Sequence, residues 1–89
     1  MSVEDSGLSC NYYVVEIKHP WSKREPYLAE CGDIMEALDM SMAECNVFKE
    51  LWRRAAARQG KKKKGNTSLR GAEKIKFFSD LIYAKELQK

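Results

Sequence analysis

The chain has 89 residues, of which 44% are hydrophobic and 33% charged, with two prolines and five glycines. This length allows one small domain and excludes a TIM barrel, a Rossmann domain or two independent domains. The formal net charge of +3 divides unevenly, because residues 1–58 hold seven Lys/Arg and ten Asp/Glu, a net −3, whereas residues 59–89 hold nine and three, a net +6. This asymmetry predicts either an anionic partner for the C-terminal part or a solvated basic face.

The N-terminal part of the chain predicts a tail and one strand. Residues 1–10 have no periodicity and are expected to form a flexible tail. Residues 11–18 are rich in aromatic and β-branched types, which predicts a short strand or extended arm. Nothing else has a strand pattern, and a lone strand leaves its backbone groups without partners. We therefore expect this segment to pair with another copy, in a homo-oligomer, or to pack over the helices as an arm.

A first helix is predicted over residues 26–39. Pro26 suits the first position of a helix, where its missing N–H group costs nothing. The apolar residues that follow recur at helical spacing; they are Tyr27, Cys31, Ile34 and Leu38.

Two further helices are predicted over residues 42–59 and 68–87. Ser41 and Glu44 form the pattern of a capping box, and Gly60 is a stop signal. The expected apolar stripes are Cys45, Phe48, Leu51, Trp52 and Ala55 in the second helix and Ala72, Ile75, Phe78 and Ile82 in the third. The predicted fold class is mainly α, with residues 11–89 as a single small three-helix domain that carries a short N-terminal β-strand or extended arm.

The cysteines and the apolar runs bear on location. Cys10, Cys31 and Cys45 are odd in number and widely spaced, unlike a disulfide framework or a zinc site. The polar, acidic start has no signal-peptide pattern, and no apolar run approaches the ~18 residues of a membrane span. We expect a cytoplasmic protein that has no membrane partner.

The strongest functional signal is a basic cluster around the end of the second helix and the start of the third. Its members are Lys49, Arg53, Arg54, Arg58, Lys61, Lys62, Lys63, Lys64, Arg70 and Lys74. Arginine forks, lysine amines and a helix N-terminus all bind phosphate. The pattern leaves open a nucleotide or cyclic nucleotide, a nucleic acid, or no phosphate ligand. Candidates for stacking on a base are Tyr12, Tyr13 and Trp21.

Catalytic patterns are weak. Glu30, Asp33 and Glu36 lie three residues apart, but a second converging set of carboxylates for magnesium is missing. The single His19 precedes Pro20 in an expected turn, and no P-loop occurs. We therefore predict no catalytic residue, no metal and no cofactor, with magnesium retained only for an enzymatic alternative.

Short motifs within residues 26–83 contain Asp33, Glu36, Asn46, Lys49, Arg53 and Lys74. These motifs resemble those of the SaV-like family of small tailed-phage proteins, whereas Cys45, Glu50 and Ile75 depart from the family pattern. One family member forms part of a phage nucleotide kinase without a Walker motif. The resemblance implies nucleotide handling in a bacterial host cell, with Asn46 added to Lys49, Arg53 and Lys74 as candidates on the phosphate side.

The predicted function is binding of a nucleotide-like phosphorylated ligand through a basic pocket, without turnover. By analogy with small phage proteins that sequester immune signals, the ligand would be a host signalling nucleotide, and the protein an anti-defence factor. The alternatives are a phosphoryl-transfer protein of the nucleotide kinase type and a DNA- or RNA-binding protein.

Overall fold

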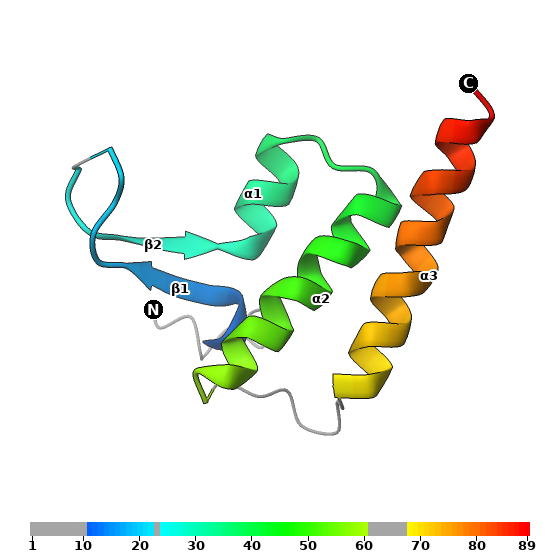
Figure 1. The fold of residues 1–89 in the computed structure, drawn as a ribbon. Coiled ribbons are helices and arrows are strands. Elements are labelled where there is room, and N and C mark those ends of the chain that lie inside the picture. The colour runs from blue at the N-terminus through cyan, green and yellow to red at the C-terminus, as the bar shows by residue number, and fades with distance from the viewer. Residues whose placement is uncertain (1–10, 23, 61–67) are drawn as a thin grey trace.

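The computed structural model describes residues 11–22, 24–60 and 68–89. A 3₁₀ turn, Asn11–Tyr13, leads into strands β1 (Val14–Ile17) and β2 (Tyr27–Glu30), which helices α1 (Cys31–Ala37), α2 (Met42–Arg58) and α3 (Ser68–Leu87) follow. Figure 1 shows α2 between the hairpin with α1 on one side and α3 on the other. The mainly α, three-helix fold with an N-terminal strand is therefore confirmed. The predicted tail, residues 1–10, lies outside the described residues.

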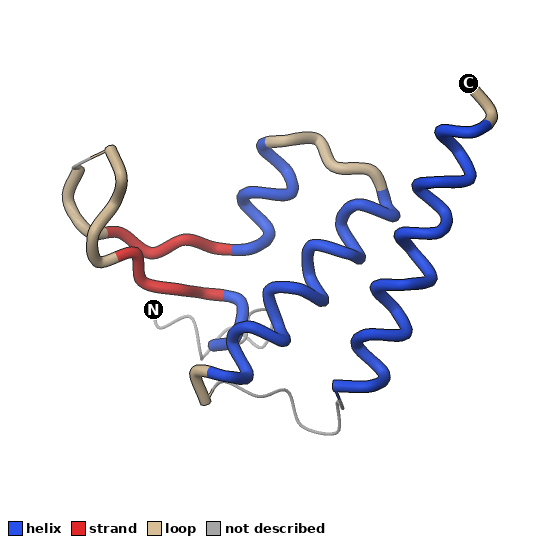
Figure 2. The backbone as a smooth tube through the Cα atoms, viewed as in Figure 1, coloured by secondary structure: helices blue, strands red, loops and turns tan. Residues whose placement is uncertain are grey.

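The strand segment pairs within the chain. β1 and β2 form a two-stranded antiparallel sheet in which Val14 faces Glu30 and Ile17 faces Tyr27 (Figure 2). The prediction that residues 11–18 lack an intrachain partner is therefore wrong. An unpaired strand is no longer a reason to expect a homo-oligomer. The partner was missed because Tyr27–Glu30 contains good helix formers, and Pro26 fits the start of a strand as well as that of a helix. Pairing with β1 satisfies backbone groups that β1 alone would leave open.

The first helix is shorter than predicted, because α1 occupies Cys31–Ala37 rather than residues 26–39. Its end is a Schellman motif: the Asp39 N–H donates to the Glu36 carbonyl at 3.1 Å, and the Met40 N–H donates to the Met35 carbonyl at 3.0 Å. Asp39 occupies the left-handed region with φ of 52°. This turn ends the helix two residues early and directs the chain into α2.

Helix α2 begins where the capping box places it. The Ser41 hydroxyl accepts from the Glu44 N–H at 3.2 Å, and the Ser41 N–H donates to the Glu44 carboxylate at 2.8 Å. Its buried face is different from the predicted stripe, since Leu51 and Ala55 are exposed. The buried residues of α2 are Ala43, Glu50, Arg53 and Ala56.

Helix α3 has the predicted bounds and packs along α2 (Figure 1). Ile75, Phe78 and Ile82 are half-buried on this contact, whereas Ala72 is exposed. Gly71 is the buried residue of α3, and a Cβ atom there would lie 3.3 Å from Glu50 Oε1. The missing side chain therefore lets the two helices approach closely around a charged residue.

The apolar core of the described residues is thin. Its buried apolar members are Cys31, Ala43 and Ala56, all small. None of the described helices has the length and apolar character that a membrane crossing requires.

Candidate functional site

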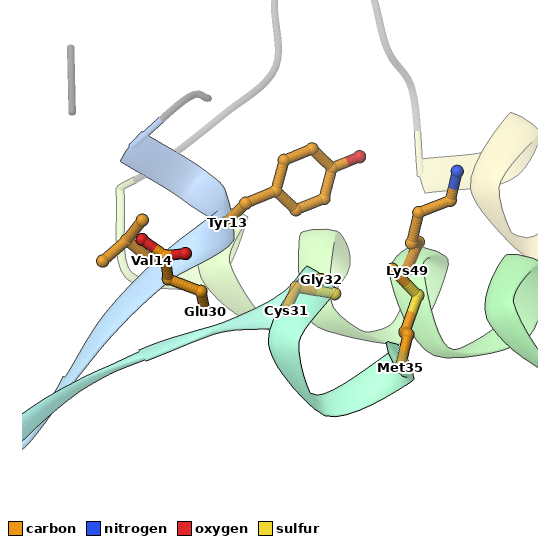
Figure 3. Close-up of a pocket in the computed structure, with 7 residues that line it drawn as sticks. All are labelled: Tyr13, Val14, Glu30, Cys31, Gly32, Met35 and Lys49. Carbon is orange, nitrogen blue, oxygen red and sulfur yellow. The ribbon is translucent and has the colours of Figure 1, made fainter. Parts of the chain in front are cut away.

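A pocket of about 240 Å³ lies where the hairpin, α1 and α2 meet. Tyr13 and Val14 reach it from the N-terminal segment, and Lys49 reaches it from α2. The remaining lining residues are Glu30, Cys31, Gly32 and Met35, at the end of β2 and along α1. Figure 3 shows the Tyr13 ring and the Lys49 amine extending toward the same side, with Glu30 beside Val14 at the opposite end. The pocket thus has an aromatic face, a thioether, one ammonium and one carboxylate.

The thiol in this pocket is buried and weakly acidic. Cys31 is 1% exposed. Burial raises the pKa of the Cys31 thiol, while the positive charges of Lys49 and Arg53 oppose the rise without cancelling it. Because the thiolate is the nucleophilic form, the raised pKa lowers the fraction of reactive thiolate at neutral pH.

The predicted phosphate ligand Arg53 lies in the interior. Glu50 and Arg53 are 3% and 8% exposed, and their side chains form an ion pair within α2. The Lys74 amine of α3 lies 3.8 Å from the same Glu50 carboxylate. The Arg53 guanidinium carbon is 6.0 Å from the centre of the Tyr13 ring. Arg53 therefore neutralises a buried acid, and within the described part of the chain its Nε has no hydrogen-bond partner.

The other predicted cations do not join Lys49 in one pocket. Arg54 contacts the start of α3, where its Nη1 donates to the Ser68 carbonyl at 3.3 Å. Arg58 and Arg70 are exposed, at the end of α2 and the start of α3. Residues 61–64, the four lysines of the predicted site, lie outside the described residues. The described part of the predicted basic site is thus divided between a pocket side and an interhelical side.

The three aromatic candidates have different environments. Tyr13 lines the pocket, and its ring centre lies 4.5 Å from that of Tyr12. The Tyr12 carbonyl accepts a hydrogen bond from the Trp52 indole at 2.6 Å, which fixes the 3₁₀ turn to α2. Trp21 is fully exposed in the loop between β1 and β2, away from the pocket lining. Only Tyr13 among these three residues is placed to contact a ligand in the pocket.

The remaining candidates contribute little ligand chemistry. The Asn46 Nδ2 donates to the Met42 carbonyl at 2.8 Å and contacts the Met42 sulfur at 3.2 Å, so its amide nitrogen is engaged along α2. In the described part of the chain, no three His, Cys, Asp or Glu side chains gather as metal ligands would.

Sequence reasoning missed most of the pocket lining. The lining residues Val14, Gly32 and Met35 were not among the predicted ligand residues, because their place in the pocket depends on contacts between distant elements. The i, i+3 spacing of Glu50 and Arg53 indicates that they can form an ion pair on a helix, but this spacing alone does not predict that the pair is buried.

Comparison of the chain with protein-family models, with curated proteins and with solved structures finds no match.

Proposed function

We propose that this protein binds a nucleotide-like phosphorylated ligand at the pocket between the hairpin, α1 and α2. The observation that supports the proposal is the Tyr13 ring and the Lys49 amine on the same side of one pocket (Figure 3). A ring offers a stacking face to any nucleobase, and an ammonium is a point-charge ligand for phosphate. The proposal concerns binding, since the pocket contains no activated nucleophile.

The size of the pocket limits how much of the ligand is enclosed. Its volume of about 240 Å³ is below the ~300–1,000 Å³ of typical small-molecule sites. We expect the base to stack on Tyr13, its N–H groups to reach toward the Glu30 carboxylate, and the phosphate to meet Lys49. The sugar would face solvent. This orientation keeps the phosphate away from Glu30, which lies at the opposite end of the pocket.

Calorimetry at low ionic strength tests the proposal with nucleoside mono- and triphosphates and cyclic dinucleotides as ligands. Lys49→Gln should weaken the binding that the wild type shows by about tenfold or more, because it removes a charge-assisted hydrogen bond. Lys85→Gln, an equal change of charge at an exposed position near the end of α3, should leave the affinity unchanged. The absence of binding by every ligand, or equal affinities of the two variants, would contradict the proposal.

A second candidate function is supported by the interhelical side. Arg54, Arg58 and Arg70 lie where α2 ends and α3 begins, and the four lysines fall between these helices in the chain. Arginines gathered at this end of the molecule suit the backbone of DNA or RNA. Binding of this kind loses affinity steeply with salt, in proportion to the number of phosphates contacted. Titration of a labelled oligonucleotide at several salt concentrations distinguishes it from pocket binding: Arg58→Gln should lower the salt slope, and Lys49→Gln should leave it unchanged.

A further inference from the structure

The outer face of α3 is a mixed apolar and charged surface that no described residue covers. Leu69, Phe77, Tyr83 and Leu87 are 72%, 60%, 67% and 67% exposed. At ~100° per residue, these four positions fall within an arc of about 120°, opposite the half-buried Ile75, Phe78 and Ile82 that contact α2. Figure 1 shows α3 at the edge of the molecule.

The size of this surface is that of an interface. The four side chains together present on the order of 500 Å² of mostly apolar surface. Monomeric proteins rarely expose a larger continuous patch, and a standard interface covers about 800 Å² on each partner. The aliphatic parts of the intervening polar side chains would supply the difference. Since the buried apolar residues of the described chain are few and small, burial of this face would add substantially to the core.

Two charges on the same face, Lys76 and Asp80, are self-complementary about residue 78, whereas the exposed Glu73 in the same arc would face Tyr83 of the second copy. Lys76 and Asp80 lie two residues before and after residue 78, near the centre of the exposed arc. Their side chains pair within the helix at 2.9 Å, and they remain 79% and 66% exposed. Leu69 and Leu87 lie nine residues on either side, at the same angular position on the helix. A helix that runs antiparallel across this face, related by a two-fold axis at residue 78, therefore places Lys76 opposite Asp80 and Leu69 opposite Leu87.

We propose that the outer face of α3 binds a second copy of this chain, antiparallel, about a two-fold axis at the level of residue 78. The two Lys76–Asp80 pairs then form a four-charge cluster at the axis, the two Phe77 rings meet beside it, and Leu69 and Leu87 close the two ends. A two-fold dimer requires a self-complementary patch, which this face provides. Helix α3 lies on the other side of α2 from the elements that line the pocket (Figure 1). Dimer formation and ligand binding can therefore be tested independently.

Charge exchange at the axis tests both the partner and the orientation. The wild-type chain should sediment as a dimer at micromolar concentration. Lys76→Asp should weaken the dimer by about tenfold or more, because it replaces two attractive contacts across the axis with repulsive ones. Asp80→Lys should also weaken the dimer, because it places positive charges opposite each other across the axis. A mixture of these two variants should restore a dimer, made of one chain of each kind, and so should the double variant that carries both exchanges.

Lys85→Gln is the control for a change of charge elsewhere on α3, and it should leave the dimer intact. Circular dichroism of every variant establishes that its helices are retained. A wild-type chain that sediments as a monomer at about 100 μM would overturn the proposal, since an interface of the expected size should hold at that concentration. A wild-type dimer that Lys76→Asp leaves intact would show that another face is used. A mixture of the two variants that stays monomeric would overturn the antiparallel arrangement.

Discussion

The buried charges of α2 give the sharpest test of how the fold is held together. Glu50 and Arg53 pair in the interior, Gly71 packs against Glu50, and Lys74 approaches the same carboxylate from α3. Removing one partner of a buried ion pair leaves the other charge without compensation and costs about 3–5 kcal/mol. Replacing both partners by apolar residues of similar size is often neutral. These two rules predict a strongly non-additive double-mutant cycle.

The structure sets the expected magnitudes. Glu50→Leu leaves the Arg53 guanidinium buried without its carboxylate, and the Tyr13 ring, whose centre is 6.0 Å away, compensates little of that charge, so unfolding should become easier by about 3 kcal/mol. Arg53→Met leaves Glu50 with Lys74 at 3.8 Å, and the Lys74 side chain is 37% exposed and able to move closer. That variant should lose about 2 kcal/mol. The double variant should lie within about 1 kcal/mol of the wild type.

The assay is urea unfolding followed by far-UV circular dichroism at one protein concentration, which keeps any effect of self-association constant. An unchanged m value establishes that the variants share the same folded state. Glu86→Ala provides the control, because Glu86 and Lys89 pair at 2.7 Å on the surface and should contribute under about 1 kcal/mol. A double variant less stable than Glu50→Leu, or a Glu50→Leu loss below about 1 kcal/mol, would refute the argument.

Three further predictions use the same unfolding assay. Gly71→Ala should not raise the stability by the ~1 kcal/mol that alanine normally contributes inside a helix, because its Cβ would lie 3.3 Å from the paired Glu50 carboxylate. Gly32→Ala is the control and should raise the stability, because a Cβ there would have nothing within 4 Å. Equal gains in the two variants would contradict this account of the α2–α3 contact. Asp39→Gly should stabilise the protein by up to about 1 kcal/mol, because φ of 52° is costly for a residue with a side chain, and a loss would show that the Asp39 side chain has a role. Burial raises the pKa of the Cys31 thiol in the folded state, so the stability that this group contributes is present below about pH 8.5 and is lost as the pH rises through the folded pKa. The wild type should therefore lose more stability than Cys31→Ala as the pH is raised above about 8.5, and parallel curves would argue against this.

The sequence predicts α2 and α3 well because their signals are local. The capping box at Ser41 and Glu44 begins α2, and Gly60, with φ of 88°, follows its end. The strand Tyr27–Glu30 could not be predicted in this way, because three of its four residues, Leu28, Ala29 and Glu30, are good helix formers and become a strand only when β1 lies alongside them. Its alternation is too short to be read as a strand pattern.

The pocket was only partly predictable, for a related reason. Lys49 and Tyr13 belong to the candidates chosen by residue type, and the structure brings both to one pocket. Cys31 and Met35 complete the lining only because the hairpin turns α1 toward α2, an arrangement that depends on contacts between segments far apart in the sequence. Residue type thus indicated the chemistry of the pocket, while its location required the fold.

The buried ion pair also changes how the charge of the chain bears on its ligand. Counted along the sequence, Lys49, Arg53 and Lys74 are three cations available to a phosphate. In the structure Arg53 is paired with a buried acid, and Lys74 lies 3.8 Å from the same carboxylate. Because a guanidinium that leaves Glu50 for a ligand would abandon a buried charge, Arg53 cannot serve the ligand without loss of stability. Among the described basic residues, Lys49 is the one that lines the pocket, and we assign the phosphate of the proposed ligand to it for this reason.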